Sequence, residues 1–210
     1  MAIRFIKIGD CEDIKIRTGI MPTRILASEG TPVECSKKII LPKHISDHGT
    51  IDTDIPLQNL QKEIAPNKLA KVGDIVISLC GPYNGAIVGD KHDGAVVSSF
   101  CAVITCENEI LRNYLLAFIN SKDFKKEIQK QIPDRQISSA ISVQTIKNVP
   151  LPVLSEDDMA EIGNNFISIC EKIQKLKRQL EVAKTSNEVS FSLMFHPERV
   201  YLNEKRYSSP

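Results

Sequence analysis

The sequence predicts an α+β fold: a mostly β domain with short packed helices, followed by a long coiled-coil-type helix. Short β-rich runs separated by turn residues occupy Phe5 to about Ser121, two helical segments follow them, and a strictly periodic apolar pattern runs from Met159 to Ala183. With 210 residues, 42% of them hydrophobic, the chain can fill one good core without disulfides or metals.

The β part is indicated by short apolar runs bounded by turn signals such as Asp93-Gly94 and His48-Gly49. The predicted strands are Phe5–Ile8, Ile25–Ala27, Lys38–Leu41, Asp74–Leu79, Gly85–Val88 and Phe100–Thr105. Two stretches rich in Asp, Pro, Gly and Asn, at Ser28–Glu34 and His44–Pro66, are predicted to be long loops. Long ordered loops on a β scaffold are where recognition usually occurs.

Two short helices are predicted at Glu109–Asn120 and at Ser121–Gln131, the second with Ser121 as its N-cap. Ile132–Thr145 is polar and irregular, and the prolines of Ile146–Leu154 indicate an extended path. Together these segments predict that a recognition domain covers residues 1–152.

A long helix is predicted over 153–184, capped by Ser155 and carrying Asp157 and Asp158 in its first turn. Its apolar residues alternate at spacings of three and four, which is typical of a coiled-coil seam. The seam consists of Met159, Ile162, Phe166, Ile169, Ile173, Leu176, Leu180 and Ala183. Such a seam needs a partner helix, although the helix could instead fold back on its own domain. Gly163 indicates a close backbone contact, and residues 185–210 form a tail of undetermined structure.

Composition restricts the class of protein. The six cysteines are scattered without a C-x-x-C pair, as in reduced proteins. No signal peptide follows Met1, and the apolar run around Ile75–Cys80 is too short to span a bilayer, so a soluble cytoplasmic chain without membrane contact is expected. With 27 basic and 26 acidic residues the net charge is +1, so bulk charge does not indicate nucleic acid, although two basic clusters could contact phosphates.

The known catalytic and metal-binding patterns are missing. Gly81, Gly85 and Gly89 lack the spacing of a phosphate-binding loop, and Gly81-Pro82-Tyr83 is only half of an N-P-P-Y motif. His44 and His48 stand four apart but without further ligands at a zinc spacing, and Pro133-Asp134 lacks the Glu-x-Lys of a nuclease core. We therefore expect no catalytic residues, no cofactor and no metal.

Several segments in order resemble a target recognition domain from the specificity (S) subunits of type I restriction-modification systems. The resemblance covers about residues 5–184, and its segments are Ile6–Asp10, His48–Asp52, Lys68–Leu79, Gly81 with Gly85, Ala95–Phe100, Tyr114–Leu116, Ile119–Ser121, Gln129–Ser142 and Val149–Pro152, followed by the long helix. Two features depart from the family: Asp157-Asp158 replaces a glutamine, and one domain with one helix is present where a full S subunit has two of each. The resemblance therefore implies a half-sized subunit.

In that family each recognition domain reads half of a split DNA target, and the long helices pair as a spacer that methyltransferase subunits bind. The resemblance thus implies a non-catalytic specificity subunit whose partners are double-stranded DNA, methyltransferase subunits and either a second copy or a second half-subunit. Two copies related by a two-fold axis would read an inverted repeat.

Polar loop residues are the expected DNA contacts, because phosphate contacts position a domain and base-edge contacts specify sequence. Candidates for phosphate contact are Lys125, Lys126, Lys130, Arg135, Gln136, Ser138 and Ser139. Candidates for base contact are Arg24, Lys37, Lys43, His44, Tyr83 and Asn84. Two other hypotheses remain open: an interaction or decoy module that binds restriction-modification subunits without reading DNA, and a stand-alone nuclease.

Overall fold

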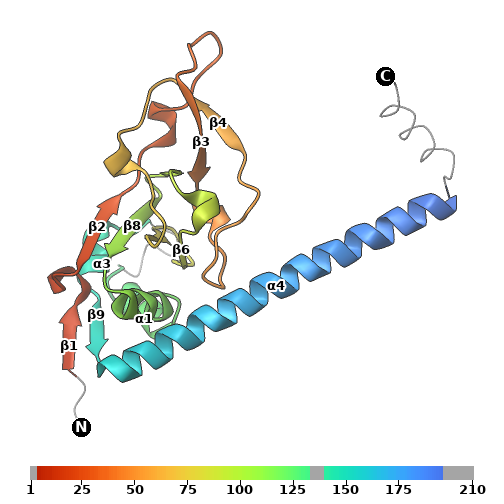
Figure 1. Cartoon of the computed structure of the whole chain (residues 1–210). Helices are drawn as coiled ribbons and strands as arrows, with labels where there is room; N and C mark the ends of the chain where they lie inside the picture. The colour runs from red at the N-terminus through yellow and green to blue at the C-terminus, as the bar shows by residue number, and fades with distance from the viewer. Residues whose placement is uncertain (1–3, 133–139, 196–210) are drawn as a thin grey trace. The chain divides into compact units, whose positions relative to one another are not determined.

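A computed structural model describes residues 4–132 and 140–195 of the chain, and only the backbone of 188–190 and 192–195. The predicted α+β class is confirmed: short strands and short helices precede one long helix (Figure 1). The chain forms two compact units, Met1–Cys170 and Glu171–Pro210. None of the helices described is long and apolar enough to cross a membrane.

A four-stranded antiparallel sheet is the centre of the first unit. Its strand order is β2-β8-β5-β6, with β2 at Ile14–Thr18, β8 at Cys101–Cys106, β5 at Ile75–Ser78 and β6 at Gly85–Ile87. Residues alternate between the two faces of a strand, and here both faces are covered. Ile75 and Ile77 join one apolar cluster, whereas Val76 joins another, which explains why Ile75–Ile77 is a continuous apolar run.

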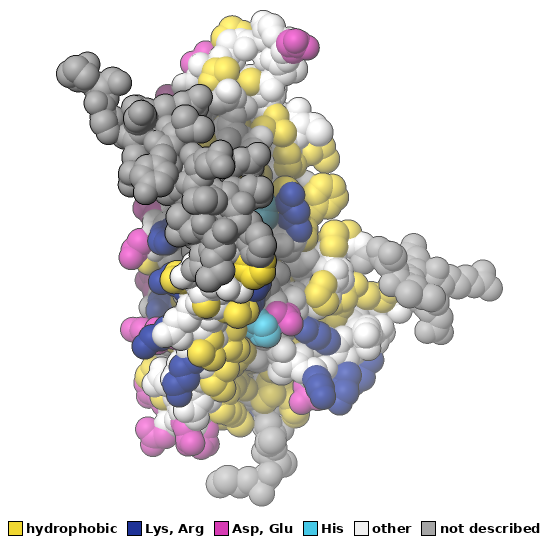
Figure 2. Space-filling view, turned by 90° about the vertical axis from the view of Figure 1, so that its right-hand side faces the viewer, with side chains coloured by type: hydrophobic (Ala, Val, Ile, Leu, Met, Phe, Trp, Pro, Cys, Tyr) yellow, Lys and Arg dark blue, Asp and Glu magenta, His cyan; other side chains and the backbone are white. Residues whose placement is uncertain are grey.

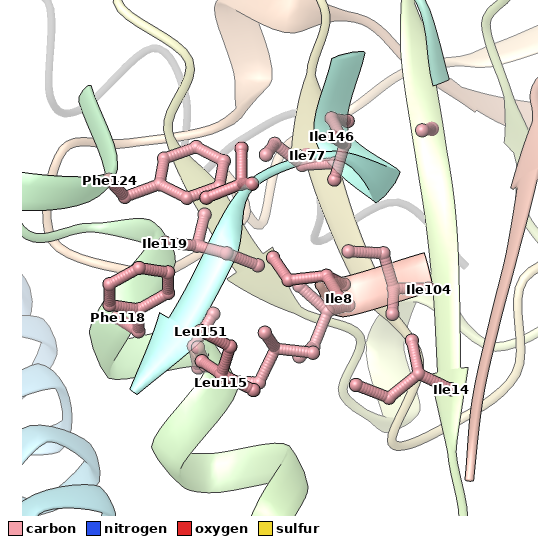
Figure 3. Packing of buried hydrophobic residues seen from close by; sticks show 14 of the residues in the cluster. Ile8, Ile14, Ile77, Ile104, Leu115, Phe118, Ile119, Phe124, Ile146 and Leu151 are labelled. Carbon is pink, nitrogen blue, oxygen red and sulfur yellow. The ribbon is translucent and has the colours of Figure 1, made fainter. Parts of the chain in front are cut away.

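The helices cover one face of this sheet. They are α1 (Glu109–Ile119), α2 (Lys122–Lys130) and α3 (Val143–Lys147). Figure 3 shows Ile77 and Ile104 of the sheet meeting Leu115 of α1, Phe124 of α2 and Ile146 of α3. Asn108, Ser121 and Ser142 cap the three helices by accepting hydrogen bonds from backbone N–H groups of the first turn. The predicted cap at Ser121 is confirmed.

The opposite face of the central sheet packs against a second sheet with the order β4-β3-β7, formed by Leu57–Leu60, Cys35–Ile40 and Val96–Val97. A two-stranded ribbon joins β1 (Arg4–Lys7) to β9 (Pro150–Val153), so the N-terminal strand meets the strand that precedes α4 (Figure 1). Short 3-10 turns lie at Ile8–Asp10, Pro22–Arg24, Pro42–His44, Pro66–Lys68 and Asp90–His92.

Several sequence-based assignments were wrong. Ile25–Ala27 is not a strand, because Ile25 follows a 3-10 turn and only Leu26 makes a bridge, to Leu60. The strand Ile14–Thr18 was missed, because the lysine and arginine within it mask its alternation. The predicted loop His44–Pro66 contains β4, which has polar residues at its centre, Gln58 and Asn59. Ile146 and Lys147 belong to α3 rather than to an extended segment, since the Ser142 cap begins a helix before the prolines.

Helix α4 spans Glu156–Phe195, eleven residues beyond the predicted end at Lys184. Ser155 caps it by accepting the Asp158 N–H at 3.2 Å. Within the first unit, Met159, Phe166 and Ile167 pack against the main core and Cys170 is buried. None of the six cysteines, all within the described residues, forms a disulfide.

Candidate nucleic-acid interface

The loop Cys80–Asn84 follows β5 at one end of the central sheet and is held at its start by Ser78. The Ser78 hydroxyl donates to the Cys80 carbonyl and accepts the Cys80 N–H at 3.1 Å. Tyr83 donates its N–H to Cys80 O at 3.1 Å and has a φ of 59°. A non-glycine residue in this left-handed region costs on the order of 1 kcal/mol and persists only where surrounding contacts determine it. The loop therefore has one defined conformation.

The end of the loop is tied to the helices that cover the sheet. Asn84 is 4% exposed, and its Oδ1 accepts a hydrogen bond from Lys125 Nζ of α2 at 2.9 Å. Gly85 exchanges two hydrogen bonds with the Asn120 side chain, at 3.1 and 3.0 Å. Two groups of candidates far apart in sequence, Tyr83 with Asn84 and Lys125, are thus brought to one place.

Two further lysines of α2 lie at the surface. Lys126 pairs with Asp123 at 3.2 Å and Lys130 with Glu127 at 2.6 Å, each within its own helix. Exposed pairs of this kind are worth at most about 1 kcal/mol, so both ammonium groups can be drawn to a phosphate. Figure 2 shows dark blue basic side chains gathered at the lower right of the face it presents, with few acidic ones among them. Arg135, Gln136, Ser138 and Ser139 lie outside the described residues.

A second group of candidates lies near the second sheet. Lys43 and His44 help to line a mainly apolar cavity of about 190 Å³, whose other walls include Pro22, Ile39 and Gln58. His44 Nδ1 accepts the Leu41 N–H at 3.2 Å, and burial lowers the pKa of this imidazole. Arg24 is exposed in its 3-10 turn and Lys37 is half-buried on β3. The structure brings Lys43 and His44 together but shows no bond from this group to the Cys80–Asn84 loop among the described residues.

Phe100 is a candidate contact that sequence reasoning missed. Its side chain is 51% exposed, and its backbone oxygen accepts the Leu79 N–H at 2.9 Å. Leu79 O in turn accepts the Ile141 N–H at 2.7 Å, so the start of the loop, Phe100 and Ile141 meet at one end of β5. The sequence offers one signal for this residue: an aromatic side chain directly after Ser98 and Ser99, at the start of an apolar strand. Taken as a strand residue, Phe100 gives no indication that it is exposed.

No cluster of three or more His, Cys, Asp or Glu residues suited to a metal is found in the described part of the chain. His44 and His48 make separate contacts, His44 with the Leu41 backbone and His48 with Asp47 at 3.1 Å. The candidate residues around the Cys80–Asn84 loop and on α2 are suited to binding a ligand through hydrogen bonds and charge.

The seam of α4 divides between two environments. Met159 and Phe166 pack inside the first unit, along with Gly163 and Cys170, at the spacing of one helix face. Ile162 and Ile169 are 42% and 53% exposed in the same unit. In the second unit Ile173 is half-exposed, Leu176 is 63% exposed, Leu180 is 55% exposed and Ala183 is exposed. We call Ile162, Ile169, Leu176 and Leu180 the exposed seam.

The chain is similar in structure to S subunits of type I restriction-modification systems. The HsdS subunit from Thermoanaerobacter tengcongensis matches over 84% of this chain with 19% identity and a TM-score of 0.53. A chain from a structure explaining complex assembly and conformational transition of the type I R-M system matches over 90% with 19% identity and a TM-score of 0.55. The type I S subunit from M. genitalium matches over 89% with 17% identity and a TM-score of 0.51.

This chain covers 39%, 43% and 44% of those three chains. At such identities the likeness is one of fold, and it confirms the fold expected from the resemblance, at about half the size of an S subunit. No family model matches the sequence, and no curated protein matches it.

Proposed function

We propose that this chain is a non-catalytic DNA sequence-specificity subunit of a restriction-modification system, working in the cytoplasm. It reads one half-site of a split target and recruits methyltransferase subunits through α4, pairing with a second copy or a second half-subunit. The observation that carries the proposal is the fold: 84–90% of the chain matches S subunits, but it covers only 39–44% of them. One recognition domain with one long helix is half of that architecture.

The exposed seam supports the pairing part of the proposal. Leu176 and Leu180 are each more than half exposed on a helix whose neighbouring residues are charged. Burying one such side chain contributes about 1.5–3 kcal/mol, so a second helix along this stripe is strongly favoured. A helix pair of fixed length would hold two recognition domains at a fixed separation, which sets the number of unread base pairs between half-sites.

The polar groups around the Cys80–Asn84 loop support the DNA part. Lys126 and Lys130 supply surface charge for phosphates, assisted by Arg135, Gln136, Ser138 and Ser139. Tyr83 lies in the loop and Phe100 beside its start, and the second group of Arg24, Lys37, Lys43 and His44 offers further base-edge donors and acceptors. A net charge of +1 supplies little overall attraction to DNA, so we expect binding to depend on such local contacts.

A salt titration tests DNA binding. The full chain should bind a random-sequence duplex, with a logarithm of the binding constant that decreases linearly with the logarithm of the salt concentration. The steepness of this line should decrease by about 0.9 for each phosphate contact removed. Lys126→Glu with Lys130→Glu should weaken this binding uniformly across sequences. Arg178→Glu, an exposed residue of α4 outside the seam, is the control for added negative charge. A wild-type chain that binds no DNA at any salt concentration would favour the alternative, a decoy that only binds restriction-modification subunits.

Co-purification and light scattering test the docking. The wild-type chain should elute as a dimer or with methyltransferase subunits, and Ile169→Asp with Ile173→Asp should abolish both states while leaving the first unit folded. If the wild-type chain is monomeric and the double variant keeps its methyltransferase, pairing through the seam is wrong. Plasmid cleavage by the isolated chain with magnesium would instead indicate a nuclease.

A further inference from the structure

The lysines of α2 do not all make the same kind of contact. Lys126 and Lys130 bind carboxylates three residues earlier on their own helix, at the surface. Lys125 is half-buried and reaches a residue 41 positions away, donating from Nζ to Asn84 Oδ1 at 2.9 Å. Lysine ammonium groups only donate hydrogen bonds, so the acceptor must be the amide oxygen.

Asn84 is buried at the end of the loop, so loss of the hydrogen bond from Lys125 would affect the loop conformation. The residue is 4% exposed, and its backbone oxygen accepts the N–H of Ser78, the last residue of β5, at 2.9 Å. A buried amide oxygen that loses its partner carries its full desolvation cost. Without Lys125, Asn84 would therefore have to turn outward and take the end of the loop with it.

The loop is fixed on both sides of Asn84. Gly85 is held by Asn120, and a Cβ at Gly85 would lie 2.8 Å from Ile119 Cγ2, so the backbone there sits directly on α1. Cys80 is held by Ser78. The residues between them, Gly81, Pro82 and Tyr83, are exposed or half-exposed and form the projecting part of the loop.

We propose that Lys125 is a positioning residue, which holds the projecting residues of the Cys80–Asn84 loop in their DNA-reading conformation by binding Asn84. Its contribution is to sequence discrimination, in contrast to the phosphate contacts of Lys126 and Lys130. This inference rests on the proposed DNA-reading function. It replaces the sequence-based hypothesis that Lys125 contacts a phosphate and Asn84 a base edge.

Hydrogen exchange on the full chain tests the positioning without DNA. Lys125→Met keeps the length of the side chain and removes its charge and its donors. Exchange at the N–H groups of Tyr83 and Gly85 should become at least about 10-fold faster, because local opening of the loop is easier. Lys126→Met, one residue along the same helix, is the matched control and should leave these rates unchanged. If these N–H groups exchange at the same rates in Lys125→Met as in the wild-type chain, the proposal is overturned.

Binding to two duplexes tests the consequence. One is a target selected by the wild-type chain from a randomised duplex library, and the other is a random sequence. Lys125→Met should lower the ratio of target to random affinity at least about 10-fold with an unchanged salt slope, whereas Lys126→Met should weaken both duplexes equally and reduce the slope by about 0.9. Equal weakening with a reduced slope in Lys125→Met would make it a phosphate contact and overturn the proposal.

A double-mutant cycle tests whether Lys125 acts through Asn84. Asn84→Ala should reproduce the loss of discrimination, and the double variant should be no worse than either single variant, because both remove the same bond. Additive losses would contradict the coupling. If the wild-type chain bound no DNA, the proposed function would fail, while the exchange rates would still decide whether Lys125 positions the loop.

Discussion

Gly163 of α4 lies directly against the backbone of Tyr114 in α1. A Cβ at Gly163 would be 2.8 Å from Tyr114 N and 2.9 Å from Asn113 C. The Tyr114 hydroxyl donates in turn to Pro152 O of β9 at 2.9 Å. The first turns of α4 therefore rest on α1 at backbone distance, and α1 is tied to the strand that precedes α4. This confirms the close contact expected at Gly163 from sequence.

Gly163→Ala should destabilise the first unit although alanine is the better helix former. Alanine gains about 1 kcal/mol in helix propensity, whereas overpacking costs about 1–3 kcal/mol and backbone atoms cannot move aside. We expect a lower free energy of unfolding in urea. Asn164→Ala, at the exposed neighbouring position, is the control and should be neutral or stabilising. A Gly163→Ala chain as stable as Asn164→Ala would show that α4 can shift without cost.

Local signals predicted much of the fold. Caps and spacing identified α1, α2 and the start of α4, and turn signals with apolar runs identified β5, β6 and β8. Strand Ile14–Thr18 and β4 escaped detection because polar residues interrupt both short runs, and pairing with other strands decides their structure.

The candidate site was predicted less well, because it depends on contacts between distant residues. Nothing in the sequence indicates that Lys125 reaches Asn84 or that Phe100 lies beside Leu79. The spacing of three and four residues revealed the seam. It could not show which seam residues face the chain's own core and which stay exposed. Met159 and Phe166 face their own core because Gly163 allows α4 to approach α1, and that approach is visible only in the folded chain.

Stability should fall as the solution is acidified below about pH 6.5, in part through His92. This residue is 5% exposed and its Nε2 lies 2.8 Å from Asp52 O. Burial lowers the pKa of His92 below its ordinary 6.5, with a contribution from Lys38 and Lys91 against the opposing effect of Asp52. The unfolded chain therefore binds a proton first as the pH falls. The contribution of His92 to the free energy of unfolding is therefore full above pH 6.5 and declines below it, by at most about 1.4 kcal/mol per pH unit.

His92→Gln provides the comparison, because glutamine can still donate to Asp52 O but does not titrate. Urea unfolding at pH 8 and at steps down to pH 5 should give a shallower decline for this variant than for the wild type. His44, whose pKa burial also lowers, is present in both chains, and the variant removes only the smaller effect of His92 on it. Identical slopes in the two chains would mean that folding does not lower the pKa of His92.

Phe100→Ala should change sequence preference more than it changes stability, because about half of the residue is exposed. An exposed aromatic side chain beside the Cys80–Asn84 loop suits apolar contact with a thymine methyl group, whose burial is worth on the order of 1 kcal/mol. Selection from a randomised duplex library should show a relaxed preference at one base pair. Val72→Ala is the matched control, since Val72 is 54% exposed in the turn before β5. The assignment fails if both variants select the same target as the wild type.

Leu180 and Val182 permit a test of the exposed seam, because the same substitution can be placed on two different faces of the helix. Both are aliphatic and exposed, 55% and 70% respectively, and they stand two residues apart in the second unit. Successive residues of a helix turn by about 100°, so Val182 points well away from the stripe that carries Leu176 and Leu180. A partner helix seated on the seam would bury Leu180 and leave Val182 in water.

Leu180→Asp should therefore weaken self-association, or methyltransferase binding, at least about 10-fold, since a buried leucine contributes about 1.5–3 kcal/mol. Val182→Asp should have no effect on the mass measured by light scattering across a concentration series. Equal losses in the two variants would indicate that the charge unfolds the helix, and a loss confined to Val182→Asp would place the partner on the other face.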